Sequence, residues 1–229
     1  MIIQTSKQTI NWNILENANN VMVKVSGGLD SAIVLYMLCR YITQSNKNIS
    51  VVVITTNDWK KPYQVKWANR VLNWMMKEFP NVKFLPHETH QLNHGEDYVD
   101  GQSAHQNQVY KQYHDNGNPI DFTLAGINLK PPKEICETFV DTKTGELHTG
   151  PTDDRTSIQP ISGDGWFKPI GNFDKKEVAE LYKQFDLLDT LFNETRSCEE
   201  PNKEVTKDFM THCGECWWCH ERKWGFGKL

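Results

Sequence analysis

The chain has 229 residues, a formal net charge of −4 and 38% hydrophobic residues. This length is enough to bury one sizeable core, and no run rich in lysine and arginine appears. The composition therefore excludes the electrostatic footprint of a nucleic-acid or membrane-surface protein. No stretch has the character of a signal core or a membrane span. The sequence thus predicts a cytoplasmic protein with neither a membrane nor a nucleic acid as a direct partner.

Strand and helix signals alternate along the first half of the chain. Short runs rich in β-branched or apolar residues predict strands at 21–25, 50–55, 82–85 and 121–126. Longer runs with helical periodicity predict helices at 31–43, 62–79 and 104–114, with Pro62 in a first-turn position. This order predicts an α/β fold, a Rossmann-like parallel sheet with helices on both faces.

The alternation breaks in residues 128–172, which are rich in proline, glycine, aspartate and threonine. A loop of this length in a compact domain predicts a lid or binding loop, with a small hairpin at 139–148. A helix is expected to follow, because Asp174 suits an N-cap and Glu177 would complete a capping box. Its core-facing stripe is predicted to comprise Val178, Leu181, Tyr182 and Phe185.

The stretch KVSGGLDSA, residues 24–32, lies between the first strand signal and the first helix signal. Gly27 and Gly28 allow the backbone to approach an anion, and the N-terminus of the following helix adds partial positive charge. The hydroxyls of Ser26 and Ser31 are further donors. Asp30 is unexpected, because its carboxylate would repel a phosphate unless a positive charge lies between them. The alternative is a tight turn in which Asp30 or Ser31 caps the helix.

The complete string SGGLDS resembles the Ser-Gly-Gly-x-Asp-Ser signature of the PP-loop ATP pyrophosphatases. That family cleaves ATP between its α- and β-phosphates and transfers AMP to a carboxylate, an amide or a similar oxygen. The resemblance implies that the loop binds ATP and that Asp30 faces a Mg²⁺ ion on the pyrophosphate, with Asp30 and Ser31 as catalytic residues. The ATP-binding residues that it implies here are Val25, Ser26, Gly27, Gly28, Leu29, Asp30 and Ser31.

Two further strand ends are expected at the same edge of the sheet, because ligands of open parallel sheets bind at the carboxyl ends of the strands. Thr55, Thr56 and Asn57 follow the second strand signal, and the resemblance places the adenosine of ATP there. The alternative is that they are only turn residues that end a strand. Gly126 and Asn128, in the stretch AGIN, resemble the family's site that faces the α-phosphate or the substrate.

A cysteine cluster is predicted near the C-terminus. Cys213, Cys216 and Cys219 form a C-x-x-C-x-x-C pattern, and Cys198 precedes them. Four thiolates suit a closed tetrahedral zinc site, and the two-residue gaps let one short knuckle present three sulfurs. An iron–sulfur cluster and a redox-active thiol pair are the alternatives.

The loop and the cysteines together resemble one particular family. SGGLDS, the helix segment KPIGNFDKKEVAELYKQFDLLD and the pattern SC…CGECWWC-x-x-R-x-x-GF are similar to the 7-cyano-7-deazaguanine synthases. The resemblance implies that ATP activates the carboxylate of 7-carboxy-7-deazaguanine and that ammonia then gives the amide. A second ATP activates the amide oxygen, and loss of AMP leaves the nitrile. ATP, Mg²⁺ and Zn²⁺ are the implied cofactors, and the implied partners are the deazapurine and ammonia.

The strand and helix signals and the C-terminal cysteines divide the chain into two regions. Residues 1–190 would form the ATP-binding and catalytic domain with its lid loop at 128–172, and residues 191–229 would form a zinc-binding segment packed on it. Lys168 is a candidate catalytic residue. The candidate substrate-binding residues are Gly126, Asn128, Lys130 and Arg155.

Two departures from the family keep other functions open. The gap between Cys198 and Cys213 is long, and NLKPPKEICETF stands where the family has a Gly-Tyr-Pro-Asp-Cys-like stretch. The alternatives are a related enzyme that stops at the amide, a PP-loop tRNA-thiolating enzyme, and a non-catalytic zinc-stapled nucleotide-binding module. Whether the protein is a homodimer is also open.

Overall fold

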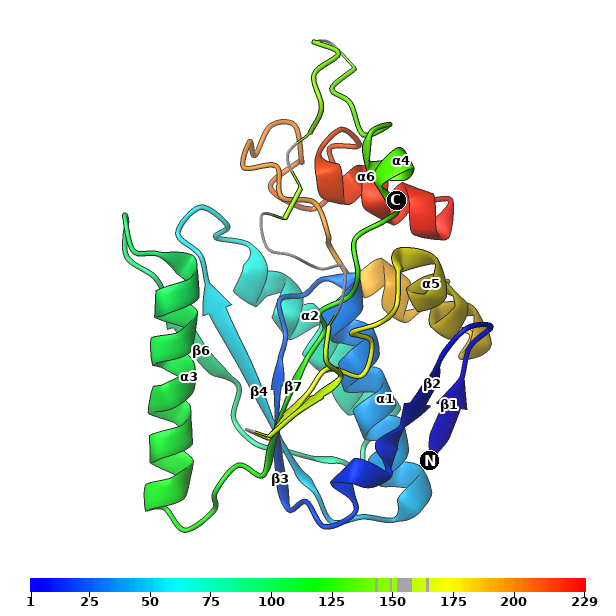
Figure 1. Ribbon diagram of the computed structural model, residues 1–229. Helices are drawn as coiled ribbons and strands as arrows, with labels where there is room; N and C mark the ends of the chain where they lie inside the picture. The colour runs from blue at the N-terminus through cyan, green and yellow to red at the C-terminus, as the bar shows by residue number, and fades with distance from the viewer. Residues whose placement is uncertain (143, 149, 152–157, 164) are drawn as a thin grey trace.

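The computed structural model describes residues 1–142, 144–148, 150–151, 158–163 and 165–229 (Figure 1). A small antiparallel hairpin opens the chain and is followed by a short 3-10 helix, Trp12–Leu15. Strands and helices then alternate as far as Ala125. The strands are β1 Ile2–Gln4, β2 Thr9–Asn11, β3 Asn20–Lys24, β4 Ser50–Asn57, β5 Lys83–Phe84, β6 Glu88–Gln91, β7 Phe122–Ala125, β8 Ile161–Ser162 and β9 Trp166–Phe167. The α-helices are α1 Leu29–Ser45, α2 Gln64–Glu78, α3 Tyr98–Asp115, α4 Lys133–Cys136, α5 Lys175–Gln184 and α6 Trp217–Phe226.

The central sheet has the strand order β5-β4-β3-β7-β9-β8, and β6 lies beside the second half of β4. All neighbouring pairs are parallel except β8 with β9. The chain moves outward from β3 to one edge and then returns to the other side of β3. The direction in which successive strands are added to the sheet therefore reverses between β3 and β7. Doubly wound sheets bind their ligands at such a point. The predicted α/β fold with a mostly parallel sheet is confirmed.

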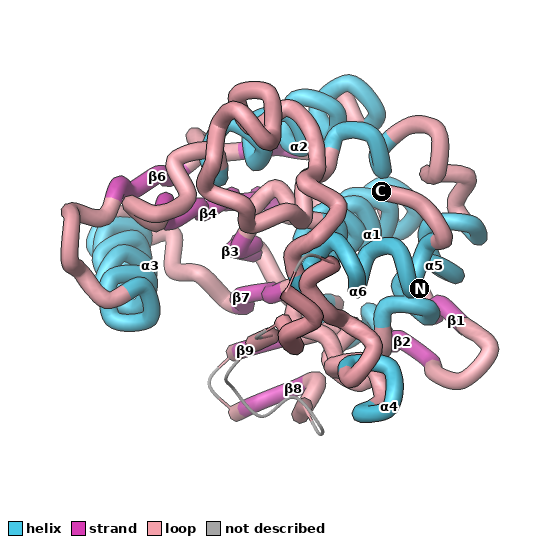
Figure 2. The backbone as a smooth tube through the Cα atoms, turned by 90° about the horizontal axis from the view of Figure 1, so that it is seen from above, coloured by secondary structure: helices cyan, strands magenta, loops and turns pink. Residues whose placement is uncertain are grey.

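Helices cover both faces of this sheet (Figure 2). Val21 and Val23 of β3 point toward α1, α2 and α5 and belong to the large core cluster. Met22 lies between them and points the other way, where it packs with Val52, Ile54 and Val109 of α3. Alternate strand residues face opposite sides, so a strand that is apolar throughout must be covered on both faces.

Several element ends differ from the prediction. Helix α1 begins at Leu29, and α3 begins at Tyr98, where the Asp97 side chain accepts bonds from two backbone N–H groups. Pro62 precedes α2, because residues 58–64 form turns joined by the bond from Lys61 N to Asp58 O. Strand β6 was not predicted, since its mostly exposed polar residues carry no apolar alternation.

The segment 128–172, predicted as a loop, contains regular structure. Strand β9 pairs in parallel with β7 and extends the central sheet, and Phe167 packs its ring 5.3 Å from that of Trp12. The predicted hairpin is present as an antiparallel bridge between Val140 and Leu147. The prediction of a long loop without regular structure was thus wrong in part, because strands of two residues leave no periodic signal in the sequence. The role of the segment as a lid stays a prediction.

The C-terminal segment lies above the carboxyl ends of the strands, with α6 beside α5 (Figure 1). Helix α5 has the predicted capping box, in which Asp174 and Glu177 bond each other's backbone N–H groups. The buried guanidinium of Arg222 on α6 donates to Phe192 O and to Thr195 Oγ1, each at 3.1 Å. These bonds fix α6 to the stretch that precedes the cysteines, within residues 191–229. Among the described residues, no helix combines the length and apolar character that a membrane crossing requires.

Candidate functional site

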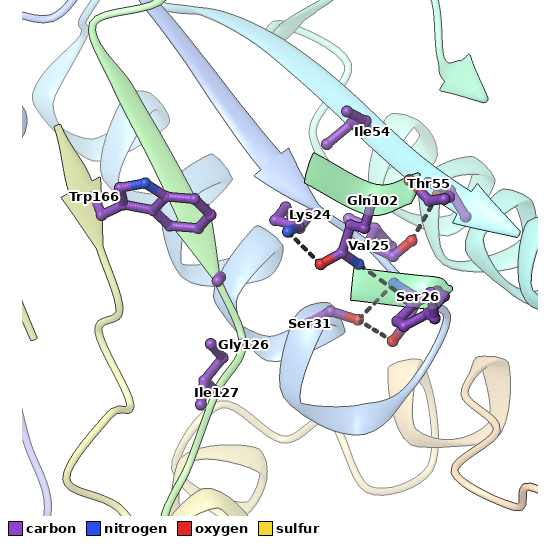
Figure 3. A pocket seen from close by; sticks show the side chains of 13 residues that line it. Lys24, Val25, Ser26, Ser31, Ile54, Thr55, Gln102, Gly126, Ile127 and Trp166 are labelled. Atoms are coloured by element: carbon purple, nitrogen blue, oxygen red, sulfur yellow. Dashed lines mark hydrogen bonds between the residues drawn. The ribbon is translucent and has the colours of Figure 1, made fainter. Parts of the chain in front are cut away.

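The glycine loop leaves β3 and enters α1 at the ligand-binding edge of the sheet (Figure 3). The hydroxyls of Ser26 and Ser31 lie 3.3 Å apart, and the Ser31 hydroxyl donates to Gly28 O at 3.1 Å. Gly28 is the N-cap of α1, and no side chain caps the helix. The alternative in which Asp30 or Ser31 is the N-cap is therefore wrong. The first N–H groups of an uncapped helix attract an anion.

Two glycines are required by close packing around this loop. Gly27 has φ +81°, and a Cβ atom there would lie 2.5 Å from Cβ of Trp67. A Cβ atom on Gly126, at the end of β7, would lie 2.5 Å from the backbone of Asp30 and Ser31. Gly126 therefore lets the end of β7 touch the start of α1, which brings two predicted parts of the site together.

The positive charge beside Asp30 comes from α5. Lys175 Nζ lies 2.8 and 2.6 Å from the two carboxylate oxygens of Asp30 and 3.2 Å from Glu221. Burial alone would lower the pKa of Lys175, but the two carboxylates outweigh it and raise the pKa, so the side chain stays charged. Sequence reasoning assigned no role to Lys175 or Glu221. The available signal was the position of Lys175 directly after the Asp174 cap, within the helix segment KPIGNFDKKEVAELYKQFDLLD that resembles the synthases.

A first cavity of about 180 Å³ lies on one side of the loop, between the strand ends and α3 (Figure 3). Ser26, Ser31 and Gly126 form the side nearest the loop. The far side includes Lys24, Gln102 and Trp166, none of which was predicted as a site residue. The signal for Lys24 was its charge in an otherwise apolar strand, VMVKV. Trp166 carried no signal, because it lies in the segment predicted as a loop.

A second cavity of about 140 Å³ lies on the other side of the same loop. Its wall continues from Gly28 and Asp30 to Arg196 and Cys198 of the C-terminal segment. The backbone N–H of Arg196 donates to Gly27 O at 2.9 Å, and its guanidinium stacks 4.0 Å from the Tyr63 ring. The cysteine segment therefore forms part of the wall beside the glycine loop. Asp30, Glu199 and Glu221 line this cavity, and each carboxylate lies within 3.2 Å of a lysine ammonium, Lys175 for Asp30 and Glu221 and Lys61 for Glu199. Carboxylates are the groups by which proteins hold Mg²⁺ on phosphates, so these side chains would hold that ion here.

The predicted residues at the end of β4 are only partly available to a ligand. Thr55 and Thr56 line the first cavity. The Thr55 hydroxyl donates to Val25 O at 2.6 Å, and the Thr56 hydroxyl lies 2.9 Å from His105 Nδ1. Asn57 is buried, and its side-chain amide bonds Gln91. Each of these three polar side chains at the strand end therefore has a hydrogen-bond partner within the protein, so no ligand is needed to explain why polar residues occur there.

The remaining candidates lie apart from the loop. Asn128 is buried and its amide donates to Leu129 O. Lys130 lines a different cavity, of about 350 Å³, with Cys136 and Trp217. Lys168 is not among the described residues that line the two cavities beside the loop, and Arg155 lies outside the described residues.

The four predicted cysteines form one cluster. The Sγ atoms of Cys198, Cys213, Cys216 and Cys219 all lie within 4.8 Å of one another. The pair 213–219 is 3.8 Å apart and the pair 198–216 is 4.0 Å apart. One tetrahedral ion about 2.3 Å from each sulfur would separate the sulfurs by about 3.8 Å. A cluster with one iron atom for each thiolate would hold the sulfurs further apart. The donor set and spacing therefore fit a single tetrahedral metal ion.

Fold and site together define a doubly wound α/β protein with a glycine loop at the end of β3 and a cluster of four cysteines whose donor set suits a metal ion. The U34-tRNA thiolase NcsA from Methanococcus maripaludis, with its 4Fe–4S cluster, is similar at a TM-score of 0.46 and 14% identity, covering 95% of this chain and 74% of that chain. An NAD+ synthetase from Burkholderia pseudomallei is similar at a TM-score of 0.39 and 12% identity, covering 95% of this chain and 77% of that chain. No protein-family model and no curated protein sequence matches the chain.

Alanine substitutions at the two adjacent glycines should separate folding from binding. Gly27→Ala should lower the free energy of unfolding by about 2–4 kcal/mol, because overpacking and a left-handed backbone add. In Gly28→Ala the new Cβ would lie 3.4 Å from Ser26 Oγ and 3.7 Å from Arg196 O, so the fold should tolerate it. Gly28 lines the second cavity, so this variant should weaken ATP binding at least about tenfold. Urea denaturation and calorimetric titration measure the two effects, and unchanged ATP affinity in Gly28→Ala would contradict phosphate binding at this loop.

Proposed function

We propose that this chain is an ATP-dependent ligase of the PP-loop type that converts 7-carboxy-7-deazaguanine to 7-cyano-7-deazaguanine in deazapurine biosynthesis. The observation that carries the proposal is the uncapped loop Ser26–Ser31 between two cavities, one of which is walled by the four-cysteine segment. The SGGLDS string and the cysteine pattern support the same assignment, since each resembles that enzyme family.

In this proposal the loop binds the phosphates of ATP. Backbone N–H groups at the start of α1 and the Ser26 and Ser31 hydroxyls donate to the phosphate oxygens. Asp30 would hold a Mg²⁺ ion, which would supply positive charge to offset that of the pyrophosphate. Lys175 keeps Asp30 in place from the buried side. The adenosine would lie beside Thr55 and Thr56, past Val25 and the strand ends.

The reaction needs two activations by ATP at the same site, first of the carboxylate and then of the amide. A carboxylate oxygen of the deazapurine attacks the α-phosphorus, the new O–P bond forms, and pyrophosphate leaves with the electron pair of the broken P–O bond. Ammonia then attacks the carbonyl carbon, and AMP leaves to give the amide. A second ATP activates the amide oxygen in the same way, and loss of AMP leaves the nitrile. The protein's share is positioning and charge stabilisation, for which the N–H groups of the loop are suited.

The cysteine cluster has a structural role in this proposal. Zn²⁺ held by four thiolates has no open position for a substrate, so it stabilises the fold of its segment. Residues 191–229 then form the wall of the second cavity, and residues 1–190 provide the loop and the sheet. Asn128, Lys130 and Lys168 do not line the two cavities beside the loop, and their predicted contacts with the substrate stay predictions, as does that of Arg155.

One incubation tests the proposal. Purified protein with ATP, Mg²⁺, ammonium and 7-carboxy-7-deazaguanine should give the amide first and then the nitrile by mass spectrometry, with AMP and pyrophosphate in each step. Ser26→Ala should lower the rate about 10²–10³-fold, as expected for loss of a donor to a developing negative charge. Ser45→Ala, at the far end of the same helix, should not change it.

The products decide between the alternatives. An amide that accumulates and is never converted would identify an enzyme that stops at the amide. Release of ADP, or no consumption of the deazapurine, would contradict the proposed chemistry. Binding of ATP without any AMP production would favour a non-catalytic module.

A further inference from the structure

Lys61 lies where the two cavities beside the glycine loop meet. It belongs to the turns between β4 and α2, and its side chain lines the second cavity. Its Nζ atom lies 5.8 Å from the centre of the Tyr98 ring, which lines the first cavity. The same atom lies 5.8 Å from the centre of the Trp218 ring, which lines the second cavity. The Lys61 ammonium therefore lies between an aromatic wall of each cavity.

The other cations among the described residues that line the second cavity are Lys175 and Arg196. Lys175 Nζ lies 2.6 Å from Asp30 and 3.2 Å from Glu221, and its side chain is 3% exposed. The buried guanidinium of Arg196 donates to two backbone carbonyl oxygens of the C-terminal segment. Both groups are thus held by partners within the protein, whereas the ammonium of Lys61 is partly exposed to the cavity.

The ion pair of Lys61 with Glu199 leaves this ammonium able to bind a ligand. Lys61 Nζ lies 2.8 Å from Glu199 Oε2, and the two side chains are 23% and 26% exposed. An ion pair at such exposure contributes little to stability, because water screens the attraction and two flexible side chains must be ordered. An ammonium group also has three donors, of which this contact uses one. A more strongly charged anion can therefore replace Glu199 at little cost.

A pyrophosphate group needs more positive charge than the wall of the second cavity provides. Three carboxylates and three cations are among the described side chains that line it, so their formal charges cancel. A bound Mg²⁺ ion would offset only part of the charge of a pyrophosphate. An unscreened negative charge in a partly enclosed site is costly unless a cation lies close to it. An ammonium that can turn toward the phosphates meets this need.

We propose that Lys61 is a catalytic residue that binds the pyrophosphate part of ATP in exchange for Glu199. The proposal rests on the function proposed above, in which adenosine lies beside Thr55 and Thr56 and the phosphates lie at the glycine loop. An ATP molecule in this position extends from the first cavity to the second, so its phosphate chain passes Lys61. When the acceptor oxygen attacks the α-phosphorus, the electron pair of the broken P–O bond remains on pyrophosphate. The ammonium keeps its proton and donates a hydrogen bond to the oxygen on which this charge develops.

Lys61→Met tests the binding role. Calorimetric titration of the full-length protein with Mg²⁺ and α,β-methylene-ATP should show affinity weakened about 10–100-fold, as for loss of a hydrogen bond to a charged group. Adenosine, which has no phosphate, should bind within about threefold of wild type. The melting temperature should change by no more than about 4 °C, because the lost ion pair is partly exposed. Lys60→Met is the matched control, since Lys60 is the preceding residue, is exposed and contacts the Trp59 ring at 5.0 Å. It should change none of these values.

Glu199→Gln separates this role from a purely structural one. The variant removes the ion pair but keeps the Lys61 ammonium. Titration with inorganic pyrophosphate is done without Mg²⁺, because Glu199 is also a candidate ligand of that ion. Glu199→Gln should bind pyrophosphate about 2–5-fold more tightly than wild type, and Lys61→Met should bind it more weakly. If the ion pair only held the cavity wall in place, both variants would lose affinity. Binding by Glu199→Gln that is no tighter than in wild type would contradict the exchange.

Two further results would overturn the assignment of Lys61. One is unchanged affinity for α,β-methylene-ATP in Lys61→Met, and the other is an equal loss of affinity for adenosine. None of these titrations contains a deazapurine, so they are independent of the proposed reaction. If wild type is inactive on 7-carboxy-7-deazaguanine but Lys61→Met loses nucleotide and pyrophosphate affinity as expected, the Lys61 site stands and the reaction does not. If wild type forms the nitrile and Lys61→Met does so at the same rate, the reaction stands and the Lys61 site does not. Absence of α,β-methylene-ATP binding in wild type would contradict both.

Discussion

Replacing Lys175 with methionine is expected to lower the free energy of unfolding by about 3–5 kcal/mol. The Lys175 side chain is 3% exposed, and its ammonium lies between Asp30 at 2.6 Å and Glu221 at 3.2 Å. Methionine would fill a similar volume but leave two carboxylates near each other without that ammonium. Urea denaturation followed by circular dichroism measures the loss. Turnover should fall as well, because Asp30 belongs to the glycine loop.

Lys176→Met is the matched control for this prediction. Lys176 is the next residue of α5, is exposed, and contacts the Trp224 ring at 5.0 Å. Its loss should cost no more than about 1 kcal/mol. Adding Glu221→Gln to Lys175→Met should recover part of the lost stability, since it removes one of the two carboxylates that the Lys175 ammonium had faced. Equal stability of the two single lysine variants would show that the buried ion pair does not hold α5 and the loop together.

Loss of the metal is expected to unfold the C-terminal segment and to abolish ATP binding. The purified protein should contain about one zinc ion per chain. Structural zinc sites in small domains contribute on the order of 10–16 kcal/mol of apparent binding free energy, which is also folding free energy. Cys216→Ser or strong chelation should therefore expose residues 191–229 to hydrogen exchange. The second cavity should then lose its wall at Arg196 and Cys198.

Cys136→Ser is the control for metal loss. Cys136 lies on α4 outside the cluster, and its thiol donates to Pro131 O at 3.3 Å. This variant should retain its metal and its ATP affinity. Iron with an equal amount of acid-labile sulfide would contradict a zinc site, and it would support the tRNA-thiolating alternative instead. Retention of the metal in Cys216→Ser would exclude that thiolate as a ligand.

The sequence predicted those features whose cause lies within a few residues. The apolar β3 run, the glycines after it and the long helix that follows predicted a glycine loop between a strand end and a helix start, and the structure confirms that arrangement. Anion binding by this loop stays a prediction. The capping box of Asp174 and Glu177 spans three residues and was predicted in full. The spacing of Cys213, Cys216 and Cys219 predicted their convergence, because a short knuckle fixes all three thiolates locally.

Tertiary structure decided the partners of these local features. Asp30 was predicted to need a neighbouring positive charge, but only the packing of α5 on α1 supplies Lys175, 145 residues along the chain. Trp166 reaches the first cavity because β9 pairs with β7. A strand of two residues is too short to show an alternation of apolar and polar residues, so the sequence did not predict it. Lys24 was visible as a charge in an apolar strand, yet its contacts with Gln102 and Trp166 depend on the packing of α3 and β9. By itself the sequence determined the loop, the cap and the cysteine knuckle, because short-range geometry specifies them. Contacts between distant segments determined which charge lies beside Asp30 and which cavity surrounds Lys24, since these depend on how whole elements pack.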